Sequence, residues 1–149
     1  MGAGSGMKRI LAAALFTLAL MDAQAQDTSA PPLPFDSPVS MRAMEAVCTG
    51  IGADARNDPR WPTYPLRIEL VGRAGEYLGQ ASVTLSQNDE AIISVRCGGP
   101  WLLIRLPPGA YDVTAEVESV SKTGRVTVPA TGQGRLVLRF PELGQEQAK

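Results

Sequence analysis

The sequence predicts an all-β protein, a seven-stranded antiparallel β-sandwich with a short N-terminal helix or loop segment. From residue 66 onward, apolar and polar residues alternate with a period of two, which is typical of strands that bury one face. Turn residues separate these short runs, and no long helix is indicated between them. A chain of 149 residues with 44% hydrophobic content provides one core, so we expect a single domain.

Residues 1–25 have the three parts of a secretory signal peptide. Lys8 and Arg9 supply positive charge, residues 10–20 are apolar, and Ala-Gln-Ala at 23–25 matches a small-x-small cleavage site. We expect cleavage near Ala25 and a periplasmic or secreted protein. The alternative is a membrane anchor, but the apolar segment is shorter than the roughly 20 residues that span a bilayer, so we expect no integral membrane segment after signal removal. Met1 and Met7 are both compatible with the signal as its start.

The next 40 residues are expected to flank the domain and not to form its sheets. Residues 26–38 contain four prolines and little apolar periodicity, which predicts a flexible segment. Ser37 and Pro38 form a typical helix start, and apolar residues four apart follow them, which predicts a short helix over 38–47. Residues 48–65 contain two glycines and three prolines, as a loop does. We expect residues 39–65 to pack on the domain as a short helix and loop.

The β-sandwich domain is predicted over residues 66–141, and residues 142–149 are expected to form a disordered tail. The seven expected strands cover residues 66–70, 81–85, 91–97, 101–106, 110–117, 124–128 and 136–140. Gly98, Gly99 and Pro100 interrupt the chain before the fourth strand. That strand carries apolar residues on both faces, so both of its faces are expected to be covered.

Cys48 and Cys97 are the two cysteines of the chain. Export would place them in an oxidising compartment, where disulfides form and persist, and Cys97 falls on the core-facing phase of its strand. We therefore expect an intrachain disulfide between them. The alternatives are two buried free thiols and an intermolecular bond.

Several kinds of chemistry are disfavoured by composition. The sequence has no histidine, which removes the Ser-His-Asp and Cys-His constellations and the commonest general base near pH 7. Two cysteines cannot build a four-cysteine metal site. With a formal net charge of −1 and arginines spread along the chain, no nucleic-acid partner is indicated. We expect no catalytic, cofactor-binding or metal-binding residues.

Residues 106–111, Leu-Pro-Pro-Gly-Ala-Tyr, resemble the corner that joins two strands in carboxypeptidase regulatory-like modules, which are transthyretin-like seven-stranded sandwiches. Further segments, at 50–54, 64–71, 75–85 and 99–111, make the chain similar to small exported proteobacterial proteins built on that module. The resemblance implies an accessory or binding module without catalytic residues. It assigns a structural corner to Leu106, Pro107, Pro108, Gly109 and Tyr111. The two cysteines and residues 57–62 depart from the general pattern of the module.

By analogy with that corner, Trp101 and Leu103 point into the sandwich, and Leu102 and Ile104 point out of it. Two explanations remain for an apolar outer face on this strand. The segment before residue 66 folds over Leu102 and Ile104, or the two side chains form a partner surface.

The function expected from these observations is a non-enzymatic exported binding or accessory module, whose partner is an envelope protein or peptide. The ligand and the oligomeric state are left open by the sequence. One alternative is a carboxylate-dependent hydrolase of the cell envelope that uses a pair among Asp54, Asp58, Asp89 and Glu90. Another is a calcium-stabilised adhesion-type module, in which loop oxygens would bind the cation.

Overall fold

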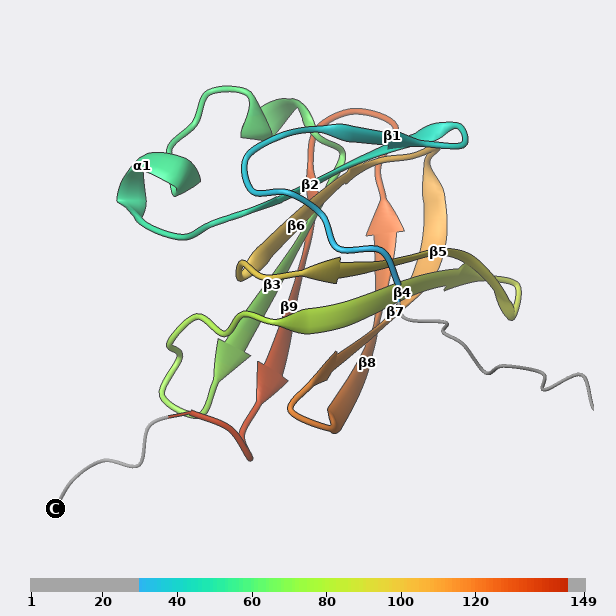
Figure 1. Ribbon diagram of the computed structural model, residues 1–149. Coiled ribbons are helices and arrows are strands. Elements are labelled where there is room, and N and C mark those ends of the chain that lie inside the picture. Colours follow the sequence, from blue (N-terminus) through green and yellow to red (C-terminus); the bar gives the residue numbers. More distant parts are fainter. Residues whose placement is uncertain (1–29, 145–149) are drawn as a thin grey trace, which may run out of the picture.

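The computed structural model describes residues 30–144, and these form two β-sheets packed face to face (Figure 1). The five-stranded sheet contains, in spatial order, β1 (Val39–Met41), β2 (Met44–Thr49), β6 (Trp101–Arg105), β3 (Leu66–Gly72) and β9 (Gly134–Phe140). The four-stranded sheet contains β5 (Glu90–Cys97), β4 (Ala81–Gln87), β7 (Gly109–Val117) and β8 (Val120–Val128). A short helix, α1 (Ala53–Arg56), and a 3₁₀ turn, η1 (Trp61–Thr63), lie between β2 and β3. The predicted all-β sandwich class agrees with this arrangement.

The described residues form nine strands, two more than the seven expected. Strands β3 to β9 correspond to the seven that alternation predicts from residue 66 onward. The start of β8 at Val120 is earlier than expected, because Glu118 and Ser119 both adopt positive φ, 48° and 68°, and close a two-residue hairpin turn. The two additional strands come from the segment that precedes residue 50.

The helix predicted over residues 38–47 is wrong, since this segment forms the hairpin of β1 and β2. Apolar residues four apart lie on one side of a strand as well as of a helix, so the spacing did not discriminate between the two. In the extended form, β2 pairs with β6 and its backbone hydrogen-bonding groups find partners there. This pairing places Val47 opposite Leu103 and Cys48 opposite Leu102. Tertiary pairing therefore outweighs the local helix-start signal at Ser37 and Pro38.

The sandwich is not wholly antiparallel, because β9 runs parallel to β3 along its whole length. The chain leaves β8 at the edge of the four-stranded sheet and crosses to the edge of the five-stranded sheet, where it enters beside β3 (Figure 1). The two edge strands approach closely at Gly124. A Cβ at this position would lie 2.9 Å from Leu138 Cδ2, so glycine permits this closure of the sandwich.

The main core lies between the two sheets and includes Leu102 and Ile104, which are 2% and 0% exposed. The orientation expected for β6 is therefore reversed. Leu103 faces the other way and packs with Val47 in a second apolar cluster. Strand β6 lies between β2 and β3 with both faces covered, so its apolar residues give no alternation from which the inward phase can be determined. Leu102 and Ile104 do not form a partner surface.

The described part of the N-terminal segment is attached to the sandwich. Leu33 is buried, and its amide donates to the carbonyl of Arg96 at 2.9 Å, while the Arg96 amide donates to Pro31 O at 2.9 Å. The expectation of a flexible segment over 26–38 therefore does not hold from residue 30 onward. Likewise, the start of the expected disordered tail is ordered, since Leu143 O accepts a hydrogen bond from Arg73 N at 2.8 Å.

Two sequence predictions concern parts of the chain that the structure does not describe. The signal peptide, with its cleavage near Ala25, and the tail from residue 145 onward lie outside residues 30–144. Within the described range, no helix has the length and apolar character needed to cross a bilayer.

Candidate binding surface at the disulfide end

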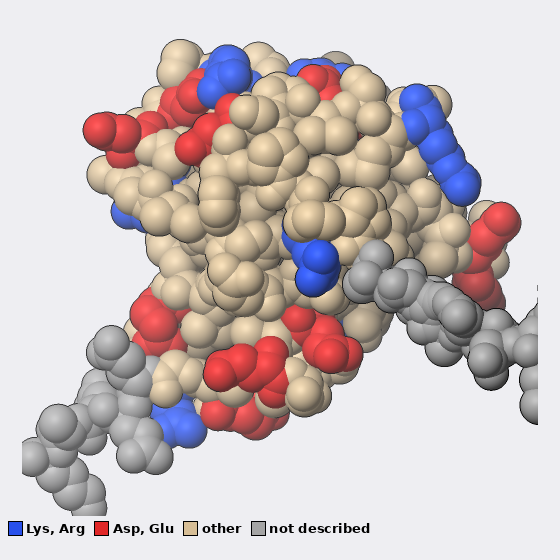
Figure 2. Space-filling view, in the orientation of Figure 1, with Lys and Arg blue, Asp and Glu red and all other residues tan. Residues whose placement is uncertain are grey.

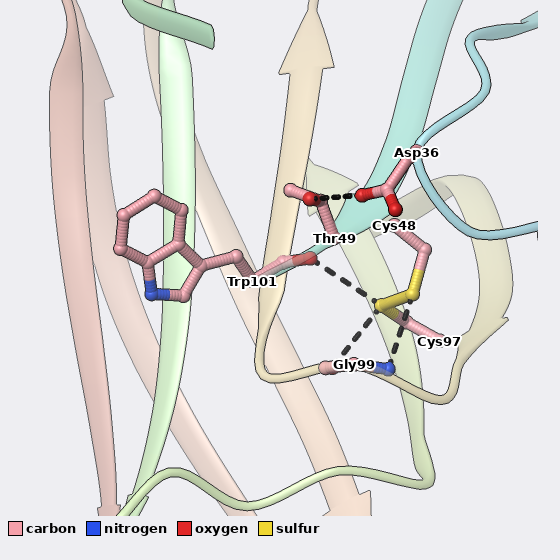
Figure 3. Close-up of a disulfide and its surroundings, with 6 residues drawn as sticks. All are labelled: Asp36, Cys48, Thr49, Cys97, Gly99 and Trp101. Atoms are coloured by element: carbon pink, nitrogen blue, oxygen red, sulfur yellow. Dashed lines mark hydrogen bonds between the residues drawn. A yellow bond between two sulfur atoms is a disulfide. The ribbon is translucent and has the colours of Figure 1, made fainter. Parts of the chain in front are cut away.

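The predicted disulfide between Cys48 and Cys97 is present, and it joins the two sheets (Figure 3). Cys48 lies in β2 of the five-stranded sheet, and Cys97 ends β5 of the four-stranded sheet. The amide of Gly99 donates to Cys48 Sγ at 3.3 Å. This position marks one end of the sandwich, which we call the disulfide end.

The corner between β6 and β7 has a structural role. The Tyr111 hydroxyl donates to Pro107 O at 2.7 Å, and burial of the ring raises the pKa of this phenol above its usual 10.0. Gly109 adopts φ +149°, a conformation that residues with a Cβ rarely adopt. Leu106 is buried in the core, so Leu106 and Tyr111 both connect the turn to the sandwich interior.

The four candidate carboxylates do not form one site. Asp54 and Asp58 lie in the segment between β2 and β3, and Asp89 and Glu90 lie at the tip of the β4–β5 hairpin, on the opposite side of Figure 1. Asp58 Oδ2 accepts a hydrogen bond from Arg60 at 2.8 Å, which holds its pKa below the usual 3.8. The four residues therefore form two separate groups, one between β2 and β3 and one at the β4–β5 turn. Within residues 30–144, no group of three or more Asp, Glu or Cys residues could hold a metal ion.

The outer face of the five-stranded sheet is covered by the segment between β2 and β3. Trp61 and Tyr64 are buried against Val47 and Leu103. The indole N–H of Trp61 donates to Ala55 O at 2.7 Å, which ties the covering segment to itself. The expected cover over β6 is therefore found, but it lies on Leu103 and not on Leu102 or Ile104.

Arginine side chains stack on the buried aromatic rings of this face and on the exposed ring of Tyr77. Four guanidinium groups lie 4.4–5.1 Å from a ring centroid, within the range of a cation–π contact. The four pairs are Arg56 on Tyr77, Arg60 on Trp61, Arg67 on Trp101 and Arg105 on Tyr64. Three of these rings, Trp61, Tyr64 and Trp101, are buried, whereas Tyr77 remains 42% exposed.

Glu69 lies buried on the same face between two arginines. Arg67 Nε is 3.0 Å from Glu69 Oε2, and Arg135 donates to both carboxylate oxygens. The carboxylate raises the pKa of the Arg135 guanidinium through this hydrogen bonding. Because Glu69 is paired on both sides, we assign it a structural role.

The outer face of the four-stranded sheet is polar. Ser94, Thr84, Thr114 and Thr123 stand in one register across all four strands. Two pairs of these hydroxyls are hydrogen-bonded, Thr84 to Ser94 at 2.9 Å and Thr114 to Thr123 at 3.0 Å. Such a face is typical of the solvated side of an antiparallel sheet.

The disulfide end differs from both faces because apolar side chains are exposed there. Phe35, Ile51 and Tyr77 are 47%, 60% and 42% exposed, and the remaining large exposed apolar side chain of the described residues, Val137, lies on β9. Two hollows, of about 490 and 320 Å³, open beside them and share Gly98 as a wall. We call Phe35, Ile51, Tyr77 and these two hollows the disulfide-end surface.

Glycines in the connections make room for this arrangement. A Cβ on Gly98 would lie 2.7 Å from the ring of Phe35, so the ring packs against bare backbone. A Cβ on Gly50 would lie 2.9 Å from the Trp101 ring, which allows the loop that carries Ile51 to approach β6. Figure 2 shows a largely uncharged band across the middle of the molecule, with side chains of both charges above it and mostly acidic side chains below it.

Sequence reasoning missed Phe35, Ile51 and Tyr77. Each stands alone in a segment rich in Gly or Pro, where no period of two or 3.6 identifies an apolar face. Ile51 is the one residue of the three that lies close to a cysteine in the sequence, directly after the Cys48-Thr49-Gly50 stretch, and Phe35 and Tyr77 carry no such signal. Only the disulfide and the strand pairing bring the three segments together.

No protein-family model matches this chain. No curated protein matches its sequence either.

Proposed function

We propose that this chain is a non-enzymatic exported module, periplasmic or secreted, that binds an envelope protein or peptide through the disulfide-end surface. The observation that carries the proposal is the exposure of Phe35, Ile51 and Tyr77 around two hollows at one end of the sandwich. Clustered exposed apolar side chains with concave surface between them are typical of binding sites. The two outer sheet faces are covered or lined with hydroxyls, so they offer no comparable apolar surface.

Two further observations support the proposal. A disulfide between sheets is typical of proteins that fold in an oxidising compartment, which fits export. The Leu-Pro-Pro-Gly-Ala-Tyr corner, with Tyr111 bonded to Pro107 O, fits the proposed membership of the carboxypeptidase regulatory-like, transthyretin-like group. Members of that group act as accessory or binding modules, as the resemblance implies.

The test is capture of the partner from the cell envelope by crosslinking to the purified exported protein. We expect Ile51→Asp to reduce the yield of the captured partner at least tenfold, because a carboxylate in the apolar contact would be desolvated without a pair. Ile51 is the most exposed of the three side chains, so its replacement should leave the fold intact.

Val137→Asp is the matched control, since it places the same charge on an exposed apolar residue of β9, outside the surface. Both variants should melt at the wild-type temperature. Equal capture by wild type, Ile51→Asp and Val137→Asp would contradict the proposed site.

A further inference from the structure

The disulfide-end surface carries charge of one sign. Arg56 lines the smaller hollow and Arg96 lines the larger one, and no Asp or Glu is among the described residues that line either. The chain as a whole is close to neutral, with 14 basic and 15 acidic residues. The absence of carboxylates from these two linings is therefore a local property of the surface.

Both arginines are held in place and keep donors free. Arg96 Nε donates to Ala30 O at 2.9 Å, and Arg56 donates one N–H to Gly50 O at 2.9 Å while stacking on Tyr77. A guanidinium has five N–H donors, so each arginine retains several without a partner among the described residues. Held guanidinium groups with free donors suit carboxylates, which accept from them bidentately.

The arrangement of the hollows suits an extended chain. The two hollows lie on either side of Gly98, and exposed apolar side chains border both, Phe35 at the larger and Ile51 with Tyr77 at the smaller. An extended peptide places alternate side chains on one face about 6.6 Å apart, so it can present successive apolar groups to neighbouring hollows. The side chains between these apolar groups point away from the hollows, toward the protein groups that surround the hollows.

Addition of the peptide to the edge of β5 is disfavoured. The register with β4 pairs Leu85 with Ile93 and Ser86 with Ala91, so Ile92 forms a bulge that disrupts the edge. At Arg96 the same edge is already occupied by the backbone of Pro31 and Leu33. A peptide at this end would therefore bind through its side chains in the hollows and not through backbone pairing with β5.

We infer that the ligand of the disulfide-end surface is an extended acidic peptide segment, whose apolar side chains enter the hollows and whose carboxylates pair with Arg56 and Arg96. This inference rests on the proposed function, because it specifies the partner of the same surface.

The experiment is selection of peptides from a phage-displayed library of random heptapeptides on the immobilised exported protein. Wild type should enrich peptides that combine Asp or Glu with large apolar residues. Peptides selected on wild type should bind Arg56→Glu/Arg96→Glu at least tenfold more weakly in fluorescence anisotropy, and this variant should itself select Lys and Arg. Arg125→Glu/Arg139→Glu is the control, since it changes the net charge equally at exposed positions outside the surface; it should select the same peptides as wild type.

Because Arg56 also stacks on Tyr77, Arg56→Gln/Arg96→Gln provides a second variant, which should lose the acidic preference without selecting basic peptides. Three results would overturn the inference: no enriched family on wild type, enriched peptides without carboxylates, or equal affinity of selected peptides for wild type and the Glu double variant. The capture experiment with Ile51→Asp tests the proposed function separately. If Ile51→Asp loses the captured partner but wild type selects uncharged peptides, the binding surface stands and only the acidic character of the ligand is rejected.

Discussion

Tyr111 connects the corner to the core through a single hydroxyl. Its ring is buried and its O–H donates to Pro107 O at 2.7 Å. A neutral buried hydrogen bond of this kind contributes about 0.5–1.5 kcal/mol to the free energy of unfolding. The tyrosine therefore stabilises the turn that precedes it in the chain.

Tyr111→Phe should lower the free energy of unfolding by about 0.5–1.5 kcal/mol, because it removes the donor and keeps the ring. It should also weaken the alkaline pH dependence of stability. The pKa of Tyr111 is raised in the folded state, so its contribution is fully present below the unfolded pKa of about 10 and is lost as pH rises through the folded pKa. Burial also raises the pKa of Tyr64, so some dependence should remain. Urea unfolding at pH 8 to 11 measures both effects, and identical curves for the two proteins would contradict them.

Gly109 permits the backbone of the same corner. At φ +149° a side chain is strained, and its Cβ would also lie 3.2 Å from Gln87 Nε2. Gly109→Val should therefore lower the free energy of unfolding by more than about 1 kcal/mol. Thr127→Val, at an exposed position on neighbouring β8, is a control that should change stability little. Equal melting temperatures for Gly109→Val and wild type would count against the assignment.

At the scale of elements, β6 organises the domain because both of its faces are buried. Leu102 and Ile104 enter the main core, and Leu103 supports the covering segment through Trp61 and Tyr64. The strand pairs with β2 on one side and β3 on the other, so it also joins the N-terminal hairpin to the rest of the sheet.

Leu102→Asp should prevent stable folding, because it would place an unpaired charge between the sheets. Leu102→Ala should cost about 2–5 kcal/mol and leave a folded protein. Circular dichroism melting of the purified proteins tests both, with the exposed Val137→Asp as control. A Leu102→Asp protein that melts like wild type would mean that this side chain reaches solvent.

For the whole molecule, the disulfide is a side-chain cross-link between the two sheets, in addition to the backbone connections. It lies where the N-terminal segment crosses from β5 to β2, as the bridges of Pro32 with Arg96 and Phe35 with Cys48 show. The same end carries the exposed apolar side chains and both hollows. Stability and the proposed binding surface thus depend on one region.

Cys48→Ala/Cys97→Ala should lower the free energy of unfolding by about 2–5 kcal/mol, because the bond restricts a loop of about 50 residues in the unfolded chain. Urea unfolding under non-reducing conditions measures the difference. Wild-type protein treated with a reductant should lose a similar amount of stability. An unchanged midpoint in both experiments would contradict a stabilising role for the bond.

The features that sequence reasoning recovered depend on short stretches of chain. Alternation identified β3 to β9, and the Leu-Pro-Pro-Gly-Ala-Tyr stretch identified the corner, because strand patterning and turn chemistry act over a few residues. The disulfide was expected from the number of cysteines and from export. It was then confirmed as the pair of Cys48 and Cys97.

The sequence by itself therefore determined the all-β class, the seven strands after residue 66 and the cysteine pair. The tertiary structure alone decided that residues 39–49 form a hairpin, that β9 runs parallel to β3 and that Leu102 points inward. It also decided that Phe35, Ile51 and Tyr77 meet at the disulfide end. These features depend on which distant segment covers each face and pairs with each edge, and the burial and backbone hydrogen bonds that select them exist only when the whole chain is folded.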